Sequence, residues 1–138
     1  MIETAFGYII NEVDEYQHRR ACYSVNKEIT RMIQLYYDIQ RIKPGAEVLF
    51  VRFNPDSYSG PNVPMSQRYN YLCQIIRDYS NIDKIGTPVS AVYLFYDGFD
   101  GNPKLEPVIY EDASERRKIT AALYSLSLAM RRKGTLSQ

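Results

Sequence analysis

The chain has 138 residues, of which 45% are hydrophobic and 24% are charged, and its formal net charge at pH 7 is +1. This length and composition predict one folded domain with a hydrophobic core rather than a disordered chain. The near-neutral charge excludes a uniformly basic nucleic-acid-binding protein, so any surface that contacts phosphate has to be a local patch.

The first half of the chain predicts a strand, a helix and a second strand. Residues 5–13 are apolar and β-branched, which is typical of a strand. Residues 22–40 carry apolar side chains at helical spacing, and Pro44-Gly45 ends that helix. Residues 47–53 are apolar enough for a central strand, and the prolines of residues 54–64 predict a loop.

The second half continues the alternation of helices and strands. We expect a helix over residues 66–79, a strand over 90–96, a turn over 97–103 and a short edge strand over 105–110. A capping box of Asp112 and Glu115 opens a last helix that ends near residue 132. The order β-α-β-α-β-β-α predicts a single α/β domain over residues 1–133, with a mixed central sheet flanked by helices and a disordered tail over 134–138.

The cysteines and the N-terminal sequence bear on the cellular compartment. Cys22 and Cys73 lie far apart and the chain has one histidine, which excludes a zinc finger. We expect both thiols to be buried and reduced rather than joined in a disulfide. The sequence has no signal-peptide pattern and no apolar run of about 20 residues. These features predict a soluble protein of the cytoplasm or nucleus.

Two carboxylates mark the end of the first predicted strand. Alternate residues of a strand share a face, so Tyr8, Ile10, Glu12 and Asp14 lie on one side. Side chains that start roughly 7 Å apart can converge on one hard cation, and carboxylate oxygens suit Mg²⁺ or Mn²⁺. Such an ion activates water and polarises phosphate. The alternative is an acidic strand end that only faces solvent.

Three segments in this order resemble one nuclease family. The strand and its extension read IINEVDEYQH, the helix carries Glu28 and Arg31 three positions apart, and the next strand reads VLFVRFNPDSY. Over residues 9–58 the chain resembles the very-short-patch-repair branch of the PD-(D/E)XK nucleases. The resemblance implies a restriction-endonuclease-like core and a Mg²⁺- or Mn²⁺-dependent endonuclease that cleaves DNA by a metal-activated water.

The resemblance also implies roles for individual residues. Glu12 and Asp14 would bind the metal, with Glu15 and Gln17 as a second pair of candidates. His18 would act near the scissile phosphate, and Gln17 or His18 would orient the water. The remaining candidates support the site or contact DNA: Glu28, Arg31 and Arg52, with Arg31 either braced by a carboxylate or facing phosphate.

The sequence departs from the family at the third carboxylate. The family usually supplies an aspartate from the preceding strand of a hairpin, but eleven residues precede Glu12 and none is aspartate. Glu3 is the sole upstream acid, nine residues before Glu12, which is tight for a strand, a turn and a returning strand. Three explanations remain: the chain is a piece of a longer protein, Glu3 substitutes, or the site is degenerate. A degenerate domain would bind nucleic acid or a protein partner without cleavage.

Two further features concern partners. Arg19 and Arg20 directly follow the motif, where they would contact phosphate or else lie in a solvated loop. An edge strand over residues 5–13 would be unpaired on one side. We therefore expect a homodimer through that edge or through a tyrosine-rich face.

Overall fold

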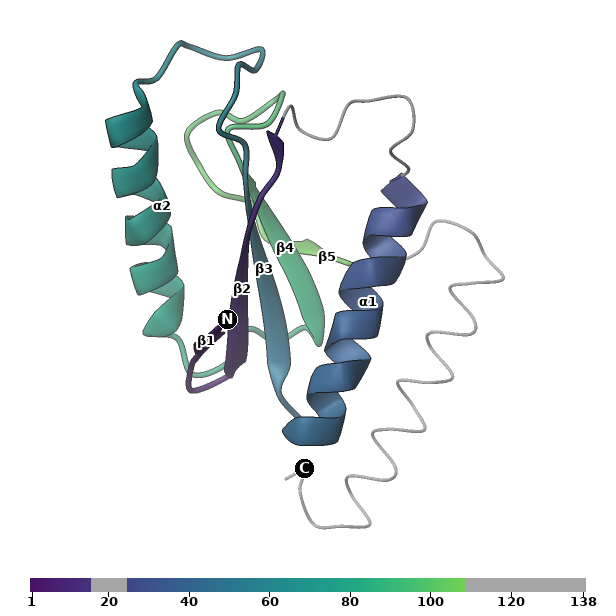
Figure 1. Ribbon diagram of the computed structural model, residues 1–138. Coiled ribbons are helices and arrows are strands. Elements are labelled where there is room, and N and C mark those ends of the chain that lie inside the picture. The colour runs from purple at the N-terminus through teal and green to yellow at the C-terminus, as the bar shows by residue number, and fades with distance from the viewer. Residues whose placement is uncertain (16–24, 109–138) are drawn as a thin grey trace.

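The computed structural model describes residues 1–15 and 25–108, and the side chains from residue 27 onward in the second range. Two helices and five strands succeed one another along these residues (Figure 1). They are β1 (Ile2–Glu3), β2 (Gly7–Val13), α1 (Val25–Ile42), β3 (Glu47–Phe53), α2 (Met65–Ser80), β4 (Val89–Leu94) and β5 (Glu106–Pro107).

The described strands form one mixed sheet in the order β1-β2-β3-β4-β5. The three long strands, β2, β3 and β4, are parallel, and the two-residue strands β1 and β5 pair with them antiparallel at the edges. The prediction of an α/β domain with a mixed sheet is confirmed. Because β2, β3 and β4 are parallel, their carboxyl ends meet at the same edge of the sheet.

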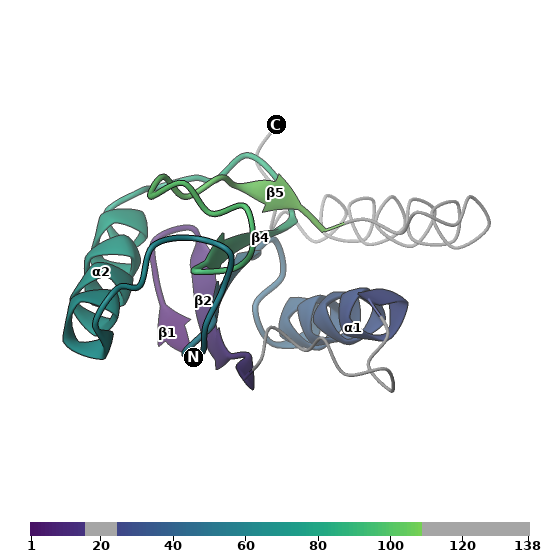
Figure 2. The same cartoon turned by 90° about the horizontal axis from the view of Figure 1, so that it is seen from above.

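Each face of the sheet carries one of the two described helices (Figure 2). Met32, Ile33, Tyr36 and Ile39 of α1 pack on Val48 and Phe50 of β3 and on their neighbours in the sheet. Leu72 and Ile75 of α2 pack on the alternate residues of the same strands. The central strand β3 is therefore buried on both faces, which accounts for its nearly continuous apolar sequence.

The two connections between parallel strands have opposite hands. Both β2–α1–β3 and β3–α2–β4 advance one strand in the same direction, yet their helices cover opposite faces. One connection therefore has the left-handed form, which is rare between parallel strands. As a result, side chains at the carboxyl edge face α1 on one side and α2 on the other.

The N-terminal hairpin was not expected from the sequence. Ile2 pairs with Ile9 and Glu3 with Tyr8, so β1 covers the start of β2. The turn is closed by Thr4, whose backbone N–H donates to the Gly7 carbonyl over 2.8 Å. The predicted open edge of β2 is therefore covered over its first residues, which corrects the expectation of a strand wholly unpaired on one side.

Three details of the C-terminal half also differ from expectation. β4 ends at Leu94, two residues early, because Phe95 has a φ of 63° and leaves the extended conformation. Helical spacing predicts Tyr69 on the apolar face of α2 beside Leu72, but the buried residues are Arg68, Leu72 and Ile75, and Tyr69 is 51% exposed. Cys73 is an exposed free thiol rather than a buried one.

Several sequence predictions fall outside the described residues. These are the helix from Asp112, the tail over 134–138, and Cys22 with the first residues of the helix predicted over 22–40. In the part of the chain that is described, neither helix is long and apolar enough to cross a membrane.

Candidate functional site

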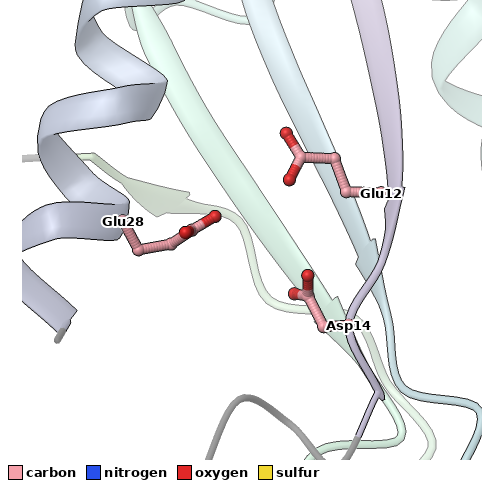
Figure 3. Close-up of side chains that lie close together, drawn as sticks. All are labelled: Glu12, Asp14 and Glu28. Carbon is pink, nitrogen blue, oxygen red and sulfur yellow. The ribbon is translucent and has the colours of Figure 1, made fainter. Parts of the chain in front are cut away.

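Side chains from the three parallel strands and from α1 meet at the carboxyl edge of the sheet. Glu12 lies near the end of β2 and Asp14 just beyond it, while Arg52 lies near the end of β3. Glu28 reaches toward them from the first turn of α1. Figure 3 shows the carboxylates of Glu12, Asp14 and Glu28 pointing toward one another.

Asp14 and Arg52 form the buried centre of this site. Arg52 Nε donates to Asp14 Oδ2 over 2.6 Å and Arg52 Nη2 donates to Asp14 Oδ1 over 2.9 Å. Both residues are only 2% exposed. Burial opposes the charged form of Arg52, but the hydrogen bonds with Asp14 and the electrostatic attraction of Asp14 and Glu28 together outweigh burial and raise the pKa of Arg52. The guanidinium therefore stays charged, and Asp14 holds it in one bidentate geometry.

Tyr96 closes the buried side of the Asp14 carboxylate. Its hydroxyl donates a short hydrogen bond to Asp14 Oδ2. Burial, followed by this hydrogen bond, raises the pKa of Tyr96 well above its ordinary value, so the phenol stays protonated and remains a donor. Sequence reasoning did not assign Tyr96 to the site. Its position directly after the third parallel strand was the signal available.

Arg31 occupies the solvent side of the site. Its Nη2 atom donates to both Glu12 Oε2 and Glu28 Oε1, and its side chain is 43% exposed. The hydrogen bond with Glu28 is the main cause of the raised pKa of Arg31. One guanidinium nitrogen thus bridges two carboxylates that come from different elements, β2 and α1.

The donor set fits a hard divalent cation. One oxygen from each of Glu12, Asp14 and Glu28 can be chosen so that all three lie within 4.8 Å of one another. Carboxylate oxygens are the ligands that Mg²⁺ and Mn²⁺ prefer. The three carboxylates face two guanidiniums, those of Arg31 and Arg52. Arg52 forms ion pairs with both Asp14 and Glu28. The cluster therefore keeps one excess negative charge, and an incoming cation competes with arginine for the same oxygens.

The structure brings five of the sequence-predicted residues together: Glu12, Asp14, Glu28, Arg31 and Arg52. Arg52 was expected to contact nucleic acid, and the structure places its guanidinium in the interior, bound to Asp14 and Glu28. Arg31 is braced by two carboxylates rather than directed at phosphate.

Two predicted acids lie outside the cluster. Glu3, expected to support the site, pairs with Tyr8 at the opposite end of β2 and forms an ion pair with Lys43 over 3.2 Å. Glu15, a predicted metal ligand, is exposed and is not among the three carboxylates that converge in the described part of the chain. The remaining predicted residues lie outside the described part of the chain: Gln17, His18, Arg19 and Arg20.

Comparisons with known proteins give no match. No family model matches the sequence, and neither a curated protein nor a solved structure is similar to the chain at a significant level.

Proposed function

We propose that this domain is a metal-dependent nuclease that acts on DNA phosphodiesters through a carboxylate-bound Mg²⁺ or Mn²⁺. The observation that carries this proposal is the convergence of Glu12, Asp14 and Glu28 at the carboxyl edge of a parallel sheet. In open α/β sheets, ligands bind outside the carboxyl ends of the strands. When bound, the ion would supply a nucleophilic water and neutralise charge on the phosphate.

Glu12 and Glu28 are the carboxylates best placed to hold the ion. Both bind the half-exposed guanidinium of Arg31, which can swing into solvent, and Glu28 binds the buried Arg52 through one oxygen only. Asp14, in contrast, binds Arg52 through both oxygens, so it contributes negative charge from behind and fixes the end of β2. Mg²⁺ is commonly held by one or two carboxylates and several waters, so this ligand set suffices.

The same residues suggest how the domain relates to the PD-(D/E)XK nucleases. We infer a restriction-endonuclease-like core in which Glu28 replaces the aspartate that the family takes from the preceding hairpin strand. A hairpin does precede β2, but its acid, Glu3, lies at the opposite end of that strand. Glu28 supplies the third carboxylate from the following helix instead, and the sequence resemblance over residues 9–58 supports the assignment.

A second function is a catalytically degenerate module that binds nucleic acid or a protein partner. The bidentate pairing of Asp14 with Arg52, completed by Tyr96, favours it. Protein groups satisfy this carboxylate without a metal, so the cluster would serve as a buried ion-pair network.

Cleavage of supercoiled DNA in the presence of Mg²⁺ or Mn²⁺ separates the two functions. The nuclease proposal predicts metal-dependent nicking that chelation abolishes. It also predicts that Glu12→Gln and Glu28→Gln each reduce the rate by more than the roughly 10–100-fold that loss of an outer-shell partner costs. A titration of Mn²⁺ by calorimetry should show one bound ion that both substitutions weaken.

The matched control is Asp38→Asn. Asp38 is an exposed acid on the same helix, where it pairs with Arg41 over 3.8 Å, so its loss removes one carboxylate outside the cluster. The control should nick DNA at the wild-type rate. Absence of Mn²⁺ binding together with absence of nicking in the wild-type protein would leave the degenerate module as the function.

A further inference from the structure

A cavity lies at the carboxyl edge of the sheet, on the face covered by α2, whereas the carboxylates face α1. Its volume is about 420 Å³, which falls in the range of ligand pockets in proteins, about 300–1,000 Å³. The loop after β3, the start of α2 and the loop after β4 surround it. Four aromatic rings line it, together with an amide and a carboxylate: Tyr58, Tyr71, Phe95, Phe99, Gln67 and Asp100.

Two consecutive residues connect this cavity to the carboxylate site. Phe95 packs among the aromatic rings on the α2 face, while the next residue, Tyr96, donates its hydroxyl to Asp14 on the other side. Their Cα atoms are about 3.8 Å apart, as in any trans peptide. The cavity and the carboxylates therefore lie on opposite faces of the same strand end.

A strained backbone holds Phe95 in this position. Its φ of 63° lies in the left-handed region, which is unfavourable for a bulky side chain. The buried amide of Asn54 supports it, since Nδ2 donates to the Phe95 carbonyl over 2.8 Å. Strain of this kind persists only where the surroundings fix it, and it is concentrated at functional sites.

Arg68 holds the opposite wall of the cavity. Its guanidinium is buried and donates to the carbonyls of Val63 over 3.0 Å and Asp56 over 2.7 Å. Its Cζ atom also lies 5.3 Å from the ring centroid of Tyr58 and 5.1 Å from that of Phe95. The loop and the rings are therefore fixed before any ligand arrives, which lowers the entropic cost of binding.

The lining selects an uncharged planar ligand. Tyr58 and Tyr71 meet Phe95 edge to face, at interplanar angles of 74° and 72°, and the Arg68 guanidinium lies over Tyr58 and Phe95, so the rings form a fixed aromatic wall. Loop carbonyls bind the Arg68 guanidinium, which is not part of the cavity lining, whereas Asp100 lines the cavity and adds a negative charge, so a phosphate is disfavoured. The exposed amide of Gln67 offers a donor and an acceptor side by side, as a base edge requires.

We propose that this cavity binds one unpaired nucleobase of the nucleic acid whose backbone the carboxylate site receives. Unpaired bases stack on aromatic side chains and hydrogen-bond through their edges. The identity of the ligand as a nucleobase rests on the proposed nuclease function, but its binding requires no metal and no cleavage.

The test measures binding in the presence of a chelator, so that it is independent of catalysis. Fluorescence anisotropy would compare a labelled single-stranded oligonucleotide with an oligonucleotide of the same length that carries abasic sites throughout. Because stacking of one base contributes roughly a factor of 10–100 to affinity, the wild-type protein should prefer the base-containing strand by about that ratio. Phe99→Ala and Gln67→Ala should each reduce the preference without changing the affinity for the abasic strand.

The control substitution is Tyr69→Ala, which removes an exposed aromatic ring of α2 that does not line the cavity. It should keep the preference, and thermal melting would establish that each variant is folded. Gln67 is exposed, so Gln67→Ala tests the cavity even if Phe99→Ala does not fold. Equal affinity of the wild-type protein for the two strands would overturn the proposal. A base preference without any metal-dependent nicking would support the cavity and count against the nuclease.

Discussion

Arg31 should act as a competitor of the metal rather than as part of its binding site. Its Nη2 atom bridges Glu12 and Glu28, the two carboxylates proposed to hold the ion, and its side chain is 43% exposed. The substitution Arg31→Met removes the positive charge and keeps an unbranched apolar stem over the same surface. We expect this variant to bind Mn²⁺ more tightly than the wild-type protein.

The size of the effect follows from the two ion pairs of Arg31 that a cation has to break, since the ion pairs of Arg52 with the same carboxylates are present in both proteins. Exposed pairs contribute roughly 0.2–1 kcal/mol each, and the low exposure of Glu12 and Glu28, at 18% and 13%, places these pairs toward the upper end. Together they amount to about 1–2 kcal/mol. Since 1.4 kcal/mol corresponds to a factor of ten in affinity, the dissociation constant for Mn²⁺ should fall roughly 5–30-fold.

Calorimetric titration of Mn²⁺ at low ionic strength measures this change directly. A second readout is thermal unfolding. A ligand that binds only the folded state stabilises the protein by an amount that grows with the logarithm of the ligand concentration divided by its dissociation constant. The Mn²⁺-induced increase in melting temperature should therefore be larger in Arg31→Met. Added salt should reduce the difference between the proteins, since it screens the exposed pairs.

The matched control is Arg41→Met on the same helix, where the exposed guanidinium pairs only with Asp38 among the described contacts. It should leave the Mn²⁺ affinity unchanged. Weaker or equal binding in Arg31→Met would refute the reasoning, because it would mean that the guanidinium supports the metal site or does not share its oxygens.

Two further predictions concern stability. Arg52→Met should lower the free energy of unfolding by about 3–5 kcal/mol in urea denaturation, because it leaves the buried Asp14 carboxylate without its partner. Adding Asp14→Asn should restore part of this loss, and a loss below about 1 kcal/mol would show that the pair is not the centre of the cluster. Burial raises the pKa of Tyr36 from 10.0 to about 12, so the folded state retains a proton that the unfolded state has lost. The contribution of Tyr36 to the free energy of unfolding is fully present below pH 10. It should fall by roughly 2–3 kcal/mol as the pH rises toward 12. Tyr36→Phe should reduce that fall relative to the wild-type protein, and identical pH profiles would contradict the assignment.

The periodicity of the sequence was sufficient for the main elements of the sheet. Alternation along residues 5–13 placed Tyr8 and Ile10 on one face, and both pack against the core under α1. Helical spacing identified the buried residues of α1, because only one face of that helix is apolar. The spacing of apolar residues was less informative for α2, because one of its buried side chains is charged. Arg68 is buried because its guanidinium binds loop carbonyls, and no apolar periodicity predicts such a contact.

The candidate site was only partly accessible from sequence. Glu12 and Asp14 were evident because they end a strand and share its face. The pairing of Arg52 with Asp14 could not be predicted from the sequence. The two residues are 38 positions apart and meet only through the parallel register of β2 and β3. Tyr96 is 82 positions from Asp14 and joins it only because β4 lies beside β3.

The sequence by itself determined where the strands and helices lie, because their periodicity depends only on neighbours along the chain. It therefore also determined that Glu12 and Asp14 stand at the end of a strand. Only the tertiary structure decided how those residues are used. The parallel strands and the helices on opposite faces bring Glu28 beside Glu12 and Asp14 and direct Arg52 inward. They also leave Glu3 at the far end of its strand, because contacts between distant segments follow from sheet order and register.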